Sequence, residues 1–178
     1  MKLVLAVAAL VLATPAFAQP RPAAGPLKGP LAGLSFLVGA WKADAGKVAD
    51  TGQTSVGTSS FTAEADGSAL LRRDRTELTN PDGKAAGGFS QVMLIYAAGV
   101  GLGAEYVDGE GHVIRYEKVS VKPGRSAVFT SASDEGQPAF RLSYELKGAD
   151  ELKVDFGMLP PGSSTLRPIA AGVLHKVK

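Results

Sequence analysis

The run in this sequence with the most chemical potential is Arg72-Arg73-Asp74-Arg75, which packs guanidinium groups and a carboxylate into four consecutive residues. On a β-strand, Arg73 and Arg75 would share one face, and Arg72 and Asp74 would share the other. A pair of arginines inside a cavity could hold a carboxylate group, whereas on the outside the run would form a salt-bridged surface. The sequence leaves open which face is interior, because the neighbouring strand candidate, residues 89–96, is apolar on both faces.

Tyrosines supply the other candidate ligand-binding groups. Tyr96, Tyr116 and Tyr144 each fall on a predicted strand, where the phenol could face a cavity or belong to a core side chain with its hydroxyl at the rim. We predict that Arg73 and Arg75 form the carboxylate anchor, with Tyr96, Tyr116 and Tyr144 as the phenolic partners.

Composition and motifs argue against most other chemistry. The chain has no cysteine and two histidines, which excludes thiol catalysis and Cys-ligated metal and leaves little for a multi-histidine site. Gly99-Val100-Gly101-Leu102-Gly103 is followed by no helix, so we expect a turn rather than a dinucleotide site. Asp108 and Glu110 are expected to be solvated turn residues. We predict no catalytic residues, and an enzyme is the least supported class.

Charge argues against a polyanionic partner. Lys plus Arg number 19 against 17 for Asp plus Glu, a formal net charge of +2, so nucleic acid is not an expected partner.

The body of the chain reads as short strands punctuated by turn residues such as Asp66-Gly67, Asp82-Gly83 and Pro123-Gly124. A short helical turn is expected first, over residues 31–37. Alternation is clearest where Phe140, Leu142, Tyr144 and Leu146 face one way. The predicted strands are Val38–Ala45, Thr54–Ala65, Ser68–Leu78, Phe89–Ala97, Gly101–Val107, His112–Val121, Ser126–Ser133, Phe140–Lys147, Glu151–Met158 and Leu166–Lys176.

Ten sequential strands with short connections predict an all-β fold, an antiparallel up-and-down β-barrel whose closure removes the exposed edges of the sheet. A two-sheet sandwich is the structural alternative.

The first residues resemble an export signal. Leu3–Ala13 is an unbroken apolar run after Met1-Lys2, and Ala16-Phe17-Ala18 has the pattern of a signal-peptidase site. We predict a signal peptide over residues 1–18, a Pro-rich tether over 19–30 and one domain over 31–178. No later stretch approaches the length of about 18 apolar residues that suggests a membrane span, so the mature protein is expected in the periplasm or secreted, and not embedded in a membrane.

Phe36-Leu37-Val38-Gly39-Ala40-Trp41 resembles the F-L-x-G-x-W opening of exported bacterial lipocalin-like domains, of the broad calycin group. The resemblance implies a barrel whose floor is closed by Trp41, with Gly39 beside it. In lipocalins a basic residue of the last strand lies across the indole, which makes Lys176 or Lys178 the expected partner, although the family usually has arginine there.

The same resemblance implies a function: a binding protein that holds a small apolar or amphipathic molecule in the barrel. Fatty-acid-binding barrels use arginine and tyrosine as anchors. Two alternatives stay open. The nitrobindins, a haem-binding branch that can handle nitric oxide, take an axial histidine from the last strand region, which here would be His175, but the W-x-G-x-G opening is missing. A non-catalytic interaction module with a filled barrel is the other. We expect no cofactor.

Overall fold

The strands follow from alternating apolar residues and glycine-rich turns, and they pair in sequence order. The computed structural model describes residues 25–47, 51–132 and 136–178. Its strands are β1 (Gly39–Ala43), β2 (Gly46–Lys47), β3 (Thr54–Glu64), β4 (Ala69–Thr79), β5 (Ala85–Ala98), β6 (Gly101–Asp108), β7 (Val113–Lys122), β8 (Ser126–Ser131), β9 (Ala139–Leu146), β10 (Glu151–Leu159) and β11 (Arg167–Lys176). Each neighbouring pair is antiparallel, as in a meander.

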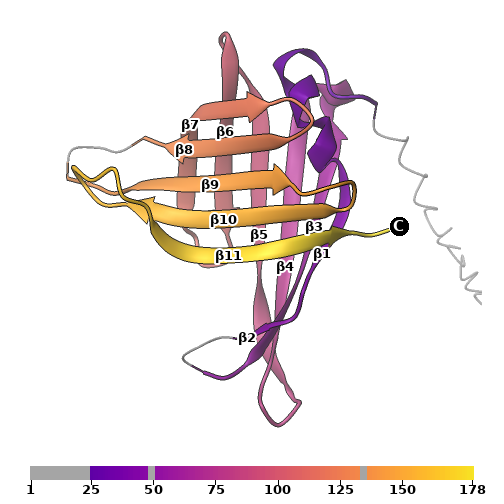
Figure 1. Ribbon diagram of the computed structural model, residues 1–178, viewed down its shortest axis with the longest axis vertical. Helices are drawn as coiled ribbons and strands as arrows, with labels where there is room; N and C mark the ends of the chain where they lie inside the picture. Colours follow the sequence, from indigo (N-terminus) through magenta and orange to yellow (C-terminus); the bar gives the residue numbers. More distant parts are fainter. Residues whose placement is uncertain (1–24, 48–50, 133–135) are drawn as a thin grey trace, which may run out of the picture.

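The sheet closes on itself because β1 pairs with β11 on one side and with β3 on the other. The two-residue strand β2 pairs with β3 beyond the end of β1, so β1 and β2 act as one interrupted strand. The predicted ten-stranded all-β barrel is therefore confirmed, and closure excludes the sandwich. In Figure 1, β3–β6 run along the long axis of the molecule and β8–β11 cross them.

The β4–β5 hairpin is longer than the sequence predicted and extends well beyond the rest of the barrel (Figure 1). Strand β5 begins at Ala85, four residues before the predicted Phe89, and its pairing with β4 shifts register between Glu77 and Thr79. Gly88 permits this pairing, since a Cβ there would lie 2.2 Å from the carbonyl oxygen of Thr76.

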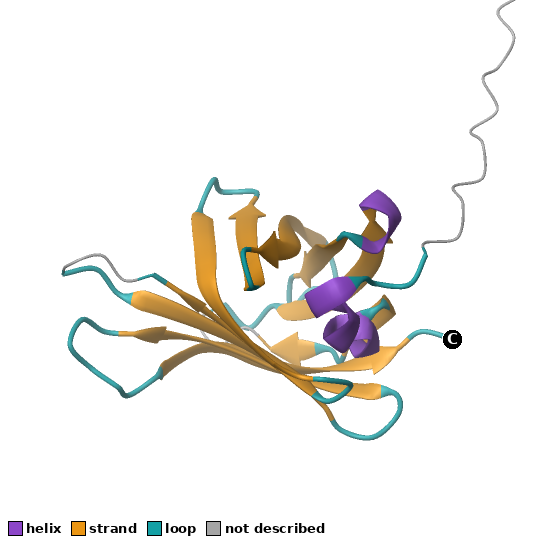
Figure 2. Ribbon diagram, turned by 90° about the horizontal axis from the view of Figure 1, so that it is seen from above, coloured by secondary structure: helices purple, strands orange, loops and turns teal. Residues whose placement is uncertain are grey.

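One end of the barrel is closed by the 3₁₀ helix η1 (Gly29–Leu37), which lies between the two curved layers of strands in Figure 2. Leu31, Leu34 and Leu37 are buried there. A second 3₁₀ turn, η2 (Ala65–Gly67), joins β3 to β4. Among the described residues, no helix has the length and apolar character needed to span a membrane.

The folded domain starts earlier than the expected residue 31. Leu27 is buried, and the backbone N–H of Lys28 donates to the Gly67 carbonyl at 2.9 Å. The Pro-rich segment from residue 25 therefore packs on the barrel instead of serving as a tether, because it brings an apolar side chain and a free backbone donor. The predicted signal peptide and the tether up to residue 24 lie outside the described residues.

Candidate functional site

The interior of the barrel is packed in one half and hollow in the other. Near η1 the space is filled by large buried side chains, among them Trp41, Phe61, Leu70, Met93 and Ile95. Beyond them lies a cavity of about 290 Å³. Its largely apolar walls and few buried polar groups mark this cavity as the candidate site.

Small residues on several strands leave room for the cavity. Strands β1, β3 and β11 contribute Ala43, Gly57, Ala170 and Gly172, while β9 and β10, which follow β11 in the sheet, contribute wider side chains. Phe89 and the β11 residues 170–172 are exposed, so they form the rim through which the cavity meets solvent. The bulkier lining residues are Phe89, Tyr106, Tyr116, Leu142, Tyr144, Val154, Phe156 and Leu174.

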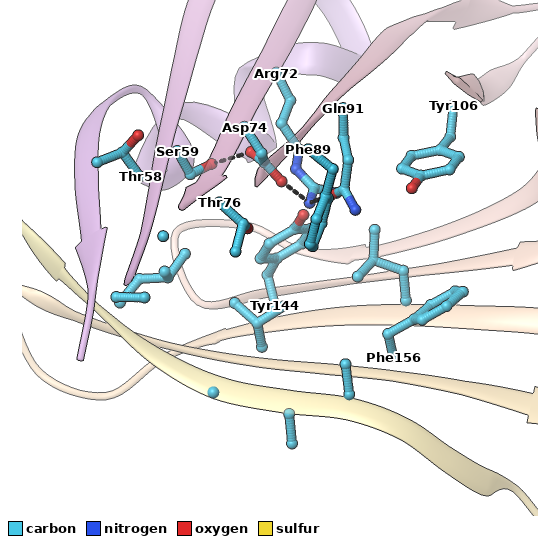
Figure 3. Close-up of a pocket in the computed structure, with 18 of the residues that line it drawn as sticks. Thr58, Ser59, Arg72, Asp74, Thr76, Phe89, Gln91, Tyr106, Tyr144 and Phe156 are labelled. Carbon is cyan, nitrogen blue, oxygen red and sulfur yellow. Dashed lines mark hydrogen bonds and ion pairs between the residues drawn. The ribbon is translucent and has the colours of Figure 1, made fainter. Parts of the chain in front are cut away.

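A buried ion pair crosses this cavity wall, formed by Arg72 and Asp74 of β4 (Figure 3). Their side chains are 11% and 13% exposed. Arg72 Nη2 donates to Asp74 Oδ2, and the Ser59 hydroxyl on β3 donates to Asp74 Oδ1 at 2.6 Å. Ser59 stands directly across the ladder from Asp74, so the strand pairing itself delivers this third group.

The guanidinium of Arg72 has further partners. Its Nη2 also donates to Gln91 Oε1 of β5 at 3.3 Å, and its Nη1 lies 3.9 Å from the sulfur of Met93. Its Cζ lies 5.7 Å from the ring centroid of Tyr144. Although burial opposes the charged form, Tyr144 and Asp74 outweigh it and raise the pKa of Arg72 above its ordinary value. Arg72 therefore keeps its charge in the cavity.

Two of the predicted tyrosines, Tyr116 and Tyr144, line the cavity. Burial raises the pKa of both phenols, with the positive charge of Arg72 acting in the opposite sense, so both hydroxyls are neutral at physiological pH. The Tyr144 hydroxyl is buried and makes no hydrogen bond of good geometry among the described residues, although Arg72 lies close enough to lower its pKa. Such a group is costly unless something satisfies it.

Tyr106 also lines the cavity, although no motif in the sequence singles it out. Its hydroxyl donates to Asp108 Oδ2 at 3.3 Å. Burial, together with the negative charge of Asp108, raises the pKa of Tyr106 to about 12. Asp108 in turn accepts hydrogen bonds from the backbone N–H groups of Glu110 and His112, so a cavity residue is tied to the β6–β7 turn.

The carboxylate anchor predicted at Arg73 and Arg75 needs correction, because both side chains lie outside the barrel. Arg73 is half exposed, with its Nη1 4.0 Å from Glu64 Oε1, and Arg75 donates to the hydroxyl of Ser90 at 3.3 Å. Leu70 is fully buried, and alternation along β4 then turns Arg72 and Asp74 inward. The opposite charges on that face were the available signal: a pair that neutralises itself is far cheaper to bury than two arginines.

Tyr96 also lies on the outer face and does not line the cavity. Ile95 next to it is buried in the core, and the Tyr96 ring packs over Gly103 of β6, where an added Cβ would meet its Cε2 at 3.4 Å. Tyr96 therefore covers a glycine on the outside of the barrel.

The residues expected at the barrel floor lie together at its closed end. Trp41 is fully buried, and its Nε1 donates to the Leu37 carbonyl at 2.7 Å. Lys176 Nζ lies 5.3 Å from the centroid of the indole ring, whereas Lys178 pairs with Asp150. Gly39 has φ of +128°, and a Cβ there would lie 3.3 Å from Cε of Lys176. Glycine thus leaves room for the lysine stem.

His175 faces outward, so the haem alternative has no axial ligand in the cavity. Its side chain is 49% exposed, and its Nε2 lies 3.2 Å from Asp44 Oδ2. The neighbouring Leu174 takes the inward position on β11. Within the described ranges, no histidine lines the cavity, and no group of three or more His, Cys, Asp or Glu side chains could hold a metal ion. These residues do not fit a haem.

No protein-family model matches the sequence, and no curated protein matches it. The class of the molecule therefore rests on its own geometry: an antiparallel β-barrel, closed at one end and hollow at the other.

Proposed function

We propose that this protein is a lipocalin-like binding protein that holds a small, largely apolar molecule in the open half of its barrel. The observation that carries the proposal is the cavity of about 290 Å³, with apolar walls and a few converging polar groups. Ligand sites have this character: hydrophobic lining supplies affinity and a few placed polar groups supply orientation.

The lipocalin-like assignment is supported by Gly39-Ala40-Trp41, which begins two residues after the end of η1. The indole lies at the closed end with the ammonium of Lys176 against it. An exported protein is supported by the apolar run Leu3–Ala13 and by Ala16-Phe17-Ala18. The proposed location is the periplasm or the extracellular medium.

Binding suits the polar groups of this cavity better than acid–base catalysis does. An arginine with a raised pKa stays protonated, so Arg72 supplies charge and hydrogen bonds rather than a transferable proton. The same holds for Tyr116 and Tyr144, which keep their protons because they are buried.

A cavity-filling substitution tests the proposal. Gly172 lines the cavity on β11, and a Cβ there meets nothing within 4 Å, so Gly172→Phe should fill the space without a clash at Cβ. We expect the neutral fluorescent probe N-phenyl-naphthylamine to bind the wild type at about one per chain. Gly172→Phe should abolish this binding while leaving the unfolding transition intact.

The matched control is Val113→Phe, which adds the same aromatic ring on the outer surface, where Val113 is 67% exposed. Probe binding should be unchanged in this variant. Absence of saturable binding by the wild type would favour the filled-barrel interaction module instead, and binding insensitive to Gly172→Phe would move the site out of the cavity.

A further inference from the structure

The charged groups that line the cavity cancel one another. Among the described lining residues, Arg72 and Asp74 are the ones that carry a charge at neutral pH, and they form an ion pair with each other. We infer that the site selects an uncharged amphiphile and discriminates against the fatty acid of the same chain length. This inference rests on the proposed binding function and specifies its ligand class.

Both oxygens of Asp74 are engaged: Oδ1 by the hydroxyl of Ser59 and Oδ2 by Arg72. The guanidinium is shared further with Gln91 and lies beside the Tyr144 ring. A carboxylate entering the cavity would have to compete with Asp74 for Arg72. It would leave two carboxylates around one guanidinium, and the excess negative charge would be buried, which is costly.

An uncharged polar group, in contrast, adds no charge to the site. Thr76 and Gln91 line the cavity with a hydroxyl and an amide, beside the Arg72–Asp74 pair in Figure 3. An alcohol, ketone, ester or amide could hydrogen-bond with these groups without adding charge. The apolar walls from Leu142, Val154 and Phe156 would enclose the hydrocarbon part of the same molecule.

The first experiment is displacement of bound N-phenyl-naphthylamine from the mature wild-type protein by three compounds with one tail: decanol, decanoate and decylammonium. We expect decanol to compete at a concentration about tenfold or more below that needed for either ion. Decanoate competing as well as decanol, or better, would overturn the inference.

Variants that remove one charge distinguish selection by the neutral Arg72–Asp74 pair from binding by apolar contacts alone. In Asp74→Asn, the amide oxygen can still accept from Arg72, but the guanidinium has lost its counter-charge. The affinity for decanoate relative to decanol should then rise about tenfold over the wild type. The matched control is Arg72→Gln/Asp74→Asn, which is uncharged again and should show no gain for decanoate. A gain in this control, or no gain in Asp74→Asn, would overturn the inference.

A variant that removes the opposite charge of the pair keeps the inference testable if Asp74→Asn does not fold. Arg72→Gln leaves Asp74 without its counter-charge, so decylammonium should gain about tenfold and decanoate should lose. Unchanged preferences in a folded Arg72→Gln protein would overturn the inference. Failure of the probe to bind the wild type rejects the binding function itself, whereas probe binding with decanoate preferred rejects the ligand class alone.

Discussion

Trp41 and Lys176 are direct partners across the β1–β11 ladder, and the ammonium of Lys176 lies 5.3 Å from the centroid of the indole ring. These two strands are the first and the last of the barrel, so this contact lies on the seam that closes the sheet. Trp41 also hydrogen-bonds to Leu37 at the end of η1, which links the seam to the helix that covers the floor. One indole therefore joins the three elements that meet at the closed end.

The contact at the seam predicts a large loss of stability for a substitution of Trp41 and a small loss for a substitution of Lys176. Trp41→Ala should lower the free energy of unfolding by about 3–5 kcal/mol, as for other large buried aromatics. Lys176→Met keeps the stem and removes the charge, so it should cost about 0.5–2 kcal/mol. Denaturant unfolding measures both, with Lys178→Met as the control because that side chain is 85% exposed. Equal stability of wild type and Trp41→Ala would contradict this account of the floor.

The tryptophan also reports on the floor spectroscopically, because it is the single tryptophan of the chain. Its complete burial predicts a blue-shifted emission maximum and weak quenching by iodide in the folded protein. Emission at long wavelength with free quenching would show that the indole is solvated.

The buried ion pair predicts a strongly non-additive mutant cycle. Asp74→Leu leaves the charge of Arg72 unpaired in the cavity wall, and breaking a buried pair in this way costs about 3–5 kcal/mol. The double variant Arg72→Met/Asp74→Leu removes both charges and should be close to wild type in stability. The exterior control, Arg73→Met, should stay within about 0.5 kcal/mol. Additive losses in the double variant would show that the two side chains are not coupled.

Strand positions could be predicted from this sequence more fully than the lining of the cavity. Turn residues and alternation locate ten strands, because strands such as β9 have one apolar and one polar face. Strand β5 has no such contrast: Val92 and Leu94 are apolar but face outward, exposed by 43% and 41%. Periodicity alone therefore could not orient β4 beside it, and the anchor predicted at Arg73 and Arg75 falls on the outer face. The neutrality of Arg72 with Asp74 on one face was the physical signal that could have decided it.

His175 shows a second limit of sequence patterns. His175 lies among apolar neighbours in the sequence, Val173, Leu174 and Val177, yet Val177 is 53% exposed and His175 pairs with Asp44 on the outside. Apolar neighbours therefore do not by themselves show that a histidine faces the cavity. Which face turns inward is decided by Leu174, whose side chain joins the core.

The β6–β7 turn predicts a measurable histidine titration. Asp108 accepts from His112 Nδ1 at 2.9 Å, and this hydrogen bond and charge raise the pKa of His112 above its ordinary value near 6.5. A raised pKa in the folded state means that the interaction stabilises the turn fully below pH 6.5 and is lost as pH rises through the folded pKa. NMR titration of the imidazole should show the raised value, and Asp108→Asn should remove most of the elevation, because the charge of Glu110 also raises the pKa of His112. An unshifted His112 in the wild type would contradict the contact.

The packing of residues 26–28 against η2 predicts that alanine substitutions at two glycines with similar backbone angles differ in their effect on stability. Gly67 and Gly83 have φ of +86° and +83°, so alanine is strained at both by about 1 kcal/mol. At Gly67 an added Cβ would also lie 2.1 Å from the Pro26 carbonyl oxygen, whereas at Gly83 it would meet nothing within 4 Å. Gly67→Ala must therefore displace the segment that carries Leu27 and the hydrogen bond from Lys28. We expect Gly67→Ala to lose clearly more stability than Gly83→Ala, and to speed amide exchange at Lys28, which Gly83→Ala should leave unchanged. Equal effects of the two substitutions on stability and on exchange would show that the segment is not held against η2.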